Sequence, residues 1–361
     1  MQWGDLITLE YGKPIKDKES ANGPIPVYGT NGQIGTSHLK PLCEHPPFIL
    51  GRKGAYRGVH YSDTPFSVID TAFYAKPISD KVDLKWAYYK FLTYDINRMD
   101  SGSAIPSTDR YEIYSIDVDL PDLVTQRRVV SVLELLDNKI QDNNKINDNL
   151  EQQAKALYKD WFLDFSPFSS DGTLPDGWRI GTVGDIIQLH DSKRVPLSGT
   201  ERSKMAKLYP YYGATSLMDY VDNYLFDGIY LLLGEDGTVV DNLGFPILQY
   251  VYGRFWVNNH AHIITGKEGF SVEELYLFFG LTNIKSIVTG AVQQKVSQQN
   301  LKKVPAIIPS STALSSFDEL IQPIFSQIRN LRDENARLTS LRDILLPKLM
   351  SGELDVSAIE L

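Results

Sequence analysis

The sequence predicts an α+β fold: two repeated, glycine-rich α/β domains separated by an antiparallel pair of long coiled-coil helices, with pseudo-twofold symmetry. Two observations carry this prediction. The chain repeats itself at an offset of roughly 180 to 190 residues, and each half ends in a long segment with heptad periodicity. The 361 residues, of which 42% are hydrophobic and 22% charged, suffice for more than one folded core.

Short motifs recur at corresponding places in the two halves of the chain. They are found at residues 3–7 and 183–187, 26–30 and 210–214, 50–54 and 233–237, 68–72 and 257–261, and 101–103 and 289–291. The offset drifts from one motif to the next, which indicates diverged copies with small loop changes. We therefore expect one domain at residues 1–122 and its counterpart at residues 171–310.

Both of these regions are rich in Gly, Pro, Tyr and short β-branched runs. Strands punctuated by glycine, with few long helical patterns, are typical of an α+β or mostly β domain with many turns. The segment that follows the first region differs in kind, because residues 124–164 contain neither Gly nor Pro.

Residues 123–165 and 311–354 predict two long spacer helices. Apolar residues in the first segment recur at alternating spacings of three and four, which is a heptad pattern. One constant shift places each seam position of the first segment on a seam position of the second, including Asn147 on Asn335. The principal seam residues are Leu133, Leu136, Ile140, Asn147, Leu150, Leu157, Ile324, Ile328, Leu331, Asn335, Leu338 and Leu345.

Each of these helices most economically pairs with the other one. A helix of about 40 residues is on the order of 60 Å long, too long for an ordinary packing role in a globular domain. In an antiparallel pair, Asn147 and Asn335 would fix the register at some cost in stability. The alternative is that each helix packs on its own domain or on another protein.

The composition excludes several classes of protein. A single cysteine, Cys43, is incompatible with an intramolecular disulfide framework or a multi-thiolate metal site. The N-terminus lacks the pattern of a signal peptide, and the longest apolar runs fall far short of the ~20 residues of a membrane helix. We expect a soluble, cytoplasmic protein with no membrane partner.

Several long motifs carry a family resemblance. They lie at residues 126–130, 136–140, 150–154, 157–165 and 345–354. Together they resemble the DNA-specificity (S) subunit of Type I restriction–modification systems, and the two glycine-rich regions resemble that family's two target-recognition domains in layout. The resemblance covers the whole chain.

The resemblance implies a subunit that is not itself catalytic. It implies binding to double-stranded DNA, to two methyltransferase subunits and to motor-nuclease subunits. It also implies no cofactor in this chain, with S-adenosylmethionine, ATP and Mg used only by the partner subunits. Two different recognition domains on a rigid spacer suit a split, asymmetric target in which the helices set the gap.

Candidate DNA-binding residues in the first domain lie on glycine-flanked loops. Arg and Lys pair with guanine or phosphate, and Asn and Gln pair with adenine. The candidates are Tyr28, Thr30, Asn31, Gln33, Arg52, Lys53, Tyr56, Arg57 and Ser103. The alternative for these loops is a hairpin turn with solvated charges.

The second domain carries different side chains at the equivalent places. Glu235 and Asp236 replace Arg52 and Lys53, and because a carboxylate accepts from cytosine, we expect the two domains to read different bases. The candidates are Lys193, Arg194, Tyr212, Thr215, Ser216, Glu235, Asp236, His260, Gln293, Gln294, Lys295 and Gln298. Turn-stabilising carboxylates and surface charge are the alternatives.

Patterns that mimic enzyme sites are incomplete. Residues 45–48 differ from an adenine-methyltransferase motif in their first residue, and Asp176 with Asp191 and Lys193 matches a nuclease pattern only loosely. His260 and His262 alternate on one strand face, but no Cys or carboxylate neighbour is evident, so we expect no metal site. No phosphate-cradling loop that ends in Lys-Ser/Thr is present.

The outer faces of the long helices and the net charge bear on how this chain would bind its partners. Outer helix residues such as Gln152, Lys155, Lys159 and Asp160 are candidates for docking methyltransferase subunits, or are simply solvated. The net charge of −9 is spread over all segments, so we expect the isolated chain to bind DNA weakly. Alternative functions are a coiled-coil scaffold, a specificity subunit of a methyltransferase-only or Type II-like system, and a free-standing enzyme acting on DNA.

Overall fold

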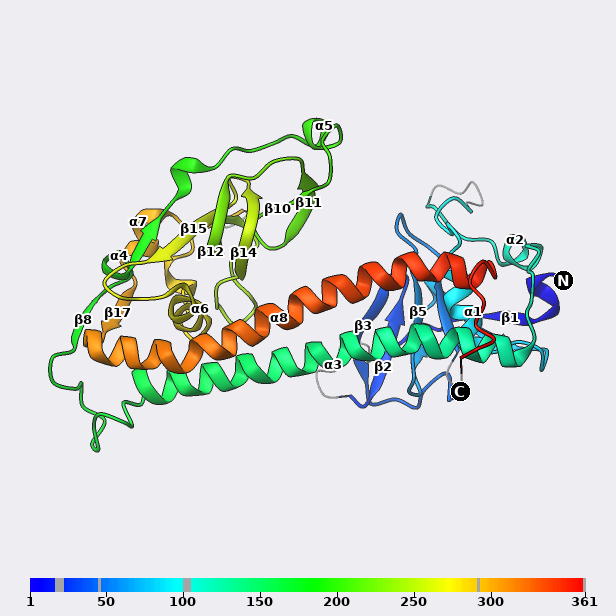
Figure 1. Ribbon diagram of the computed structural model, residues 1–361, viewed down its shortest axis with the longest axis horizontal. Helices are drawn as coiled ribbons and strands as arrows, with labels where there is room; N and C mark the ends of the chain where they lie inside the picture. Colours follow the sequence, from blue (N-terminus) through cyan, green and yellow to red (C-terminus); the bar gives the residue numbers. More distant parts are fainter. Residues whose placement is uncertain (17–22, 45–46, 100–104, 291–292, 360–361) are drawn as a thin grey trace. The chain divides into compact units, whose positions relative to one another are not determined.

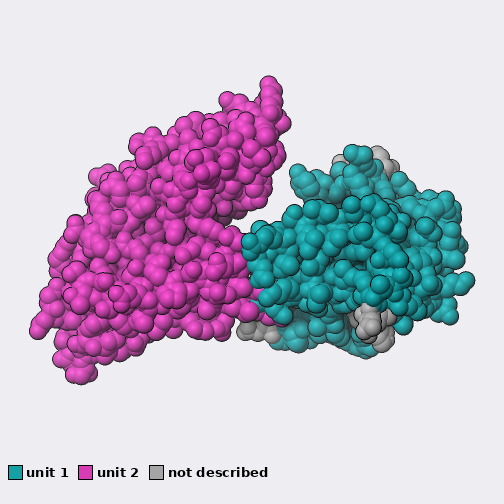
Figure 2. Space-filling view, in the orientation of Figure 1, with its two compact units in different colours: residues 1–142, 334–361 teal, residues 143–333 magenta. Residues whose placement is uncertain are grey.

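The computed structural model describes residues 1–16, 23–44, 47–99, 105–290 and 293–359. They fall into two compact units, which Figure 2 colours separately. Unit 1 comprises Met1–Asp142 and Glu334–Leu361, and unit 2 comprises Asn143–Asp333. The predicted α+β fold class is confirmed, because each unit combines sheets with helices and each contains half of the long helices α3 (Leu123–Phe162) and α8 (Ser311–Met350) (Figure 1).

Unit 1 builds its sheets from short strands. One sheet has the strand order β1-β7-β4-β5 and is antiparallel throughout, and another has the order β3-β2-β6, in which β2 and β6 are parallel. The elements are η1 (Trp3–Asp5), β1 (Ile7–Tyr11), β2 (Ile25–Gly29), β3 (Gly32–Ser37), β4 (Phe48–Gly51), β5 (Val59–Tyr61), β6 (Ser67–Val68), β7 (Ala72–Pro77), α1 (Leu84–Phe91) and α2 (Arg110–Tyr114).

Unit 2 has a larger sheet with the strand order β11-β10-β14-β12-β15-β9. Smaller pairings join β13 to β16 and β17 to β8. The elements are β8 (Arg179–Thr182), α4 (Val183–Ile186), β9 (Ile187–Leu189), η2 (Asp191–Lys193), α5 (Gly199–Arg202), β10 (Tyr209–Tyr212), β11 (Leu217–Val221), β12 (Phe226–Gly234), β13 (Asp236–Gly237), β14 (Leu248–Val257), β15 (Ala261–Gly266), α6 (Val272–Gly280), η3 (Lys285–Ile287), β16 (Gln294–Lys295), α7 (Gln298–Lys302) and β17 (Pro305–Ile308).

The sequence repeat is also a repeat of strand pairing. Motifs that match in the sequence occupy the same places in the sheets of the two units. The equivalent pairs are Tyr28↔Val68 and Tyr212↔Val257 in the parallel pairings, and Gly51↔Ala72 and Gly234↔Ala261 in the antiparallel ones.

The first repeated motif is a helix start. Asp5 in η1 and Asp185 in α4 each complete a capping box, accepting a hydrogen bond from the backbone N–H of Gln2 or Thr182 at 2.9 and 2.8 Å. Such a carboxylate satisfies a backbone donor that has no partner within the helix. The Gly-Asp pair is therefore repeated because both copies begin with the same short turn.

The long helices bury their seams within each unit. All twelve principal seam residues are buried or half-buried. In unit 1, the core contains Leu133 from α3 together with Leu349 from α8, and in unit 2 Ala154 of α3 lies in one core with Ile321 of α8. The predicted pairing of the two helices is thereby confirmed, and it is antiparallel because the start of α3 packs with the end of α8.

Packing divides the chain differently from the expected domain limits. The helices begin at Leu123 and Ser311, next to the expected limits, but the compact units divide within each helix, at Asp142/Asn143 and Asp333/Glu334. The reason is that each half of a helix packs on the sheets of its own unit. Among the described residues, every helix is too short or too polar to span a lipid bilayer.

Candidate nucleic-acid interface

In unit 1, the two candidate loops are joined by one threonine. Thr30, in the turn between β2 and β3, donates through Oγ1 to the backbone carbonyls of Lys53 (2.7 Å) and Thr71 (2.9 Å). Its own carbonyl accepts from the N–H of Gly58 at 3.0 Å. A Cβ on Gly51 would lie 2.4 Å from that carbonyl oxygen, so this close approach requires glycine.

The loop at residues 51–58, here called the Arg52 loop, carries several cations, of which Arg52 lies over aromatic rings. The guanidinium of Arg52 lies 4.7 Å from the ring centroid of Tyr11 and donates to the carbonyl of Asp70 at 2.8 Å. Lys53 is exposed, and the side chain of Tyr56 is 79% exposed. A cation over an aromatic ring, an exposed lysine and an exposed tyrosine on one loop suit contacts to phosphate and base faces.

Arg57 differs from the expectation that it reaches base edges. It is only 3% exposed, and its Nη2 donates to the carbonyl of Asn97 at 2.8 Å. Asn97 Oδ1 in turn accepts from the backbone N–H of Arg57, also at 2.8 Å. Arg57 therefore anchors the loop to the segment after α1 and is turned away from a ligand.

The remaining candidates of unit 1 have varied positions. Asn31 and Gln33 are exposed at the β2–β3 turn, whereas Tyr28 is half-buried and packs edge-on against Phe66. Ser103 lies outside the described residues.

In unit 2, strand pairing brings two candidate segments together. β13 pairs with β16, with Asp236 opposite Lys295 and Gly237 opposite Gln294. In unit 1, the equivalent bridge joins Lys53 to Ser107, which supports the predicted correspondence of these segments. An open pocket of about 770 Å³ lies beside the unit 2 pairing and is lined by residues that include Thr238, Lys285, Gln293 and Gln294.

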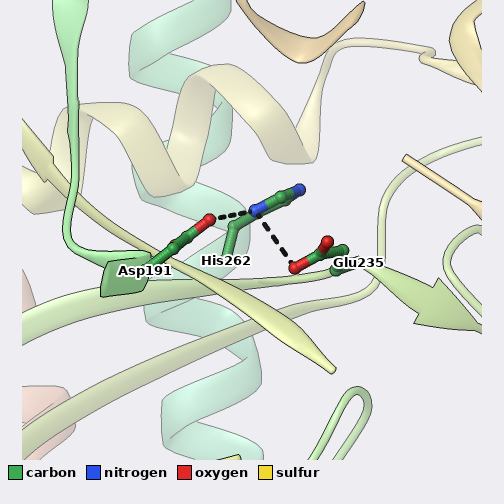
Figure 3. Close-up of side chains that lie close together, drawn as sticks. All are labelled: Asp191, Glu235 and His262. Carbon is green, nitrogen blue, oxygen red and sulfur yellow. Dashed lines mark hydrogen bonds and ion pairs between the residues drawn. The ribbon is translucent and has the colours of Figure 1, made fainter. Parts of the chain in front are cut away.

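Charged side chains cluster around Glu235, which lies in the loop at residues 234–238, here called the Glu235 loop. His262 of β15 lies between Asp191 and Glu235 (Figure 3). Its Nδ1 is 2.6 Å from Asp191 Oδ2 and 3.7 Å from Glu235 Oε2, and its Nε2 is 2.8 Å from the carbonyl of Val296. His262 is fully buried and bonded through both ring nitrogens.

Cations balance the two carboxylates of this cluster. Arg194 Nη1 donates to Glu235 Oε2 at 2.5 Å, and Lys295 Nζ lies 3.5 Å from Glu235 Oε1. Gln298 Nε2 donates to Asp191 Oδ2 at 2.5 Å. Burial tends to raise the pKa of the Asp191 carboxyl, but the bonds from His262 and Ile263 and the charge of Arg194 hold this pKa below its usual value.

The ligand atoms of Asp191, Glu235 and His262 lie within 4.8 Å of one another, as in a three-ligand metal site. The expectation that the strand histidines have no carboxylate neighbour is thus wrong, because His262 lies beside Asp191 and Glu235, and His260 beside Asp236. Arg194, however, already bonds Glu235 and lies 3.6 Å from Asp191 Oδ2. The positive charge that a metal would supply is present as a guanidinium, so the arrangement supports an ion-paired network.

The other unit 2 candidates lie around this cluster. His260 Nδ1 hydrogen-bonds Asp236 Oδ1, and the backbone N–H of Glu235 donates to the carbonyl of His260 at 2.8 Å. Lys193, Thr215 and Ser216 are exposed, and Tyr212 is half-buried.

Sequence reasoning missed several residues that the structure places at these loops. Asp191 was noted only as part of a weak nuclease pattern, and Tyr11 and Arg110 were not noted at all. The guanidinium of Arg110 lies 5.0 Å from the ring centroid of Tyr11, although the two residues are far apart in the sequence. The usable signal was the repeat itself, since Arg110 and Gln298 each begin a short helix at the same place in the two copies.

Comparison with known proteins gives consistent matches. Residues 1–152 and 175–340 match the Type I restriction modification DNA specificity domain. The Type I restriction enzyme MjaIX specificity subunit of Methanocaldococcus jannaschii is 25% identical over 314 residues, covering 78% of this chain and 71% of the relative. The HindI specificity subunit of Haemophilus influenzae is 23% identical over 320 residues, covering 67% and 70%.

A solved structure supports the fold. The S subunit of a Type I restriction–modification system from M. genitalium superposes with a TM-score of 0.60 at 15% identity. The match covers 97% of this chain and 95% of that one, so the arrangement of sheets and long helices is a known fold.

Proposed function

The chain belongs to the family of Type I restriction–modification DNA specificity subunits, which are not themselves catalytic, and on that premise we propose that units 1 and 2 each read one half of a split DNA sequence. The loops of the candidate interface would make the base and phosphate contacts. The target would be double-stranded and asymmetric.

The observation that carries this proposal is one scaffold built twice with different side chains. Gly51 and Gly234 occupy the same strand position, opposite Ala72 and Ala261. The residue that follows is Arg52 in unit 1 and Glu235 in unit 2. The two residues have the same backbone position but opposite charge. This supports two domains that approach DNA in the same way and select different bases.

In unit 1, the proposed contacts are cationic and amide groups. Arg52 and Lys53 provide donors for guanine or phosphate, and exposed Asn31 and Gln33 provide the paired donor and acceptor that adenine requires. Tyr56 is exposed and can lie against the sugar–phosphate backbone.

In unit 2, the proposed contacts combine amides with two lysines. Gln293, Lys295 and Lys193 are exposed, and Gln294 is half-buried beside them. Asp236, bonded to His260, offers a carboxylate acceptor near the pocket. Thr215 and Ser216 are exposed at the turn that matches the Asn31 turn of unit 1.

We further propose that two methyltransferase subunits and motor-nuclease subunits bind this chain in the cytoplasm. S-adenosylmethionine, ATP and Mg would be used by those subunits. Of the candidate docking residues, Gln152, Lys159 and Asp160 are exposed, and Lys159 pairs with Asp164 at 2.5 Å.

The repeat bears on where two copies of one partner would dock. The α8 residues equivalent to Gln152, Lys155, Lys159 and Asp160 have different chemistry: Ser340, Asp343, Pro347 and Lys348. Identical pairs along the helices lie on the buried seam, such as Leu150 with Leu338. Two copies of one partner would therefore recognise the backbone shape that the two halves share, and not these four side chains.

Mapping of methylated adenines tests the proposal. Cells that carry the complete system should show one split methylated motif, and cells that lack this chain should lose that motif alone. Returning the chain on a plasmid should restore it. An unchanged methylome after deletion, with the partner subunits still expressed, would contradict the proposal.

A further inference from the structure

We propose that four equivalent positions in the two units, one of them Arg52 or Glu235 itself, determine how the Arg52 loop and the Glu235 loop are presented to DNA, and that their different chemistry makes the two half-sites different. This inference rests on the proposed function. In unit 1 the positions are occupied by Tyr11, Arg52, Phe73 and Arg110, and in unit 2 by Asp191, Glu235, His262 and Gln298.

Strand register establishes the equivalence. Tyr11 lies two residues after Leu9, which pairs with Ala75, and Asp191 lies two residues after Leu189, which pairs with Ile264. If the register is continued by two residues, Tyr11 lies opposite Phe73 and Asp191 lies opposite the equivalent residue, His262.

The other positions follow from the neighbouring strands and helices. Phe73 and His262 directly follow the alanines that pair with Gly51 and Gly234, and Arg52 and Glu235 directly follow those glycines. The fourth position is the first residue of α2 or α7, next to the N-cap Asp109 or Ser297.

In unit 1, these positions form a cation–aromatic cluster. The Tyr11 and Phe73 rings are 5.0 Å apart, and the guanidinium of Arg52 lies 4.7 Å from the first and 5.8 Å from the second. Arg110 lies 5.0 Å from the Tyr11 ring. Arg52 donates to the carbonyl of Asp70 and Arg110 to the hydroxyl of Tyr111 at 3.1 Å. Within the described ranges, neither guanidinium pairs with a carboxylate, so both charges stay available to an anion such as DNA phosphate.

In unit 2, the same positions form a hydrogen-bonded ionic cluster. Asp191 accepts from Gln298 and bonds His262, and His262 lies 3.7 Å from Glu235. Glu235 is 14% exposed in its side chain and is held by Arg194 and Lys295. The charge of Glu235 is thus satisfied inside the domain, which leaves the amides and the exposed lysines, Lys193 and Lys295, to face a ligand.

In each unit, two of the four residues support the loop and would affect DNA recognition only through it. Tyr11 and Phe73 present two aromatic rings, tilted by 58° to each other, against which the planar guanidinium of Arg52 lies. Asp191 and His262 fix a carboxylate and the cations around it. Tyr11, Phe73, Asp191 and His262 are therefore positioning residues, and each pair determines how the loop of its own unit is held against its half-site.

A conservative pair of substitutions tests unit 1. Tyr11→Leu removes the ring beneath Arg52, whereas Tyr11→Phe keeps it, and the Tyr11 side chain is 45% exposed. Each variant is expressed with the partner subunits, and methylated adenines are mapped. Tyr11→Leu should raise methylation at sequences that deviate in one half-site by on the order of tenfold, with the other half-site unchanged. Tyr11→Phe should keep the wild-type motif.

Two further variants extend the test without deleting buried bulk. Arg110→Gln installs the residue found at the equivalent position of unit 2 and should relax the same half-site as Tyr11→Leu. Asp191→Asn keeps the size of the side chain and should relax the opposite half-site. Tyr224→Leu is the matched control, because Tyr224 stacks on Arg254 at 4.9 Å outside the four positions and should leave the motif intact.

The outcomes separate this inference from the proposed function. If the wild-type chain gives no split motif, the proposed function fails. If wild type gives the motif and these variants leave both half-sites unchanged, or relax both together, the positioning role is refuted. Thermal unfolding of each purified variant shows whether lost methylation reflects misfolding, and relaxation of one half-site in a stably folded variant supports the inference.

Discussion

Two adjacent buried glutamates of α6 illustrate how neighbours set the state of a side chain. Glu273 accepts from the Tyr250 hydroxyl at 2.6 Å and from Arg329 at 3.0 Å, so its charge is paired. Glu274 accepts from the backbone N–H of Ser271 at 2.7 Å, but its other oxygen has no partner among the described residues. Burial, with the nearby charges of Asp318 and Glu273, raises the pKa of Glu274 to about 8.

This pKa predicts a pH-dependent stability at the residue scale. Between its ordinary value of 4.5 and about 8, the unfolded chain has released the Glu274 proton and the folded chain retains it. The free energy of unfolding therefore falls as the pH rises through this window. Since one pKa unit corresponds to about 1.4 kcal/mol, Glu274→Gln should stabilise the protein by a few kcal/mol at pH 8.5 and little at pH 4.5.

Urea unfolding of wild type and Glu274→Gln at both pH values measures this effect. Glu319→Gln is the control, since Glu319 is exposed on α8. An equal stability difference at the two pH values would show that the carboxyl of Glu274 titrates normally in the folded state.

Arg57 and Lys53 show what sequence could not decide at this scale. Both were equally good candidates on one glycine-rich loop. The partner that turns Arg57 inward, Asn97, is 40 residues away in the chain and carries no motif. Local patterns select residue types that suit DNA contacts, but burial depends on contacts with distant segments.

At the scale of elements, the long helices follow their periodicity closely. The heptad spacing predicted which face of α3 and α8 is buried, because a stripe that recurs every 3.5 residues stays on one side of a helix. It did not reveal the ion pairs that flank the seam, such as Arg342 with Asp137 at 2.9 Å in unit 1 and Arg332 with Glu151 at 2.9 Å in unit 2.

The polar seam residues predict a measurable cost in stability. Asn147 is 7% exposed, and its Oδ1 has no hydrogen-bond partner in the part of the chain that the structure describes. Because an unsatisfied buried polar atom costs about 1–3 kcal/mol, Asn147→Leu should raise the free energy of unfolding by an amount in that range. Chemical denaturation measures it.

Asn335→Leu is the matched comparison on the other helix. The Asn335 amide donates to the carbonyl of Ile140 at 3.5 Å, so its replacement should stabilise less than that of Asn147. A loss of stability in Asn147→Leu would show that this asparagine contributes more through register than it costs through burial.

Helix α8 contains two prolines in its interior, where proline is ordinarily unfavourable. Pro323 and Pro347 lie inside the continuous helix α8, although proline removes a backbone donor and disfavours a helix interior. Both are exposed, so the ring lies away from the seam. The buried seam on the opposite face supplies the packing that keeps the helix intact.

At the scale of the whole molecule, the length of the two helices should set the gap in the DNA target. Each helix runs continuously from one unit into the other. Deleting one heptad from each, residues 138–144 and 332–338, keeps the seam in phase and shortens each helix by about 10 Å. We expect the methylated motif to keep its bases and to lose about three base pairs from its gap.

Methylome mapping of the double deletion measures the gap directly. Deleting either heptad alone takes the two seams out of register and should abolish methylation. An unchanged gap in an active double deletion would mean that the helices do not determine the spacing.

The sequence by itself determined the fold class, the repeat, the pairing of the long helices and the family. These depend on periodicity and recurring motifs, which survive as patterns in the chain. The tertiary structure alone decided which polar side chains face outward, because pairing in a sheet joins residues far apart in sequence. It brought Asp191 to His262 and Arg110 to Tyr11, and so showed that the two copies share one scaffold in which Arg52 and Glu235, of opposite charge, occupy equivalent positions.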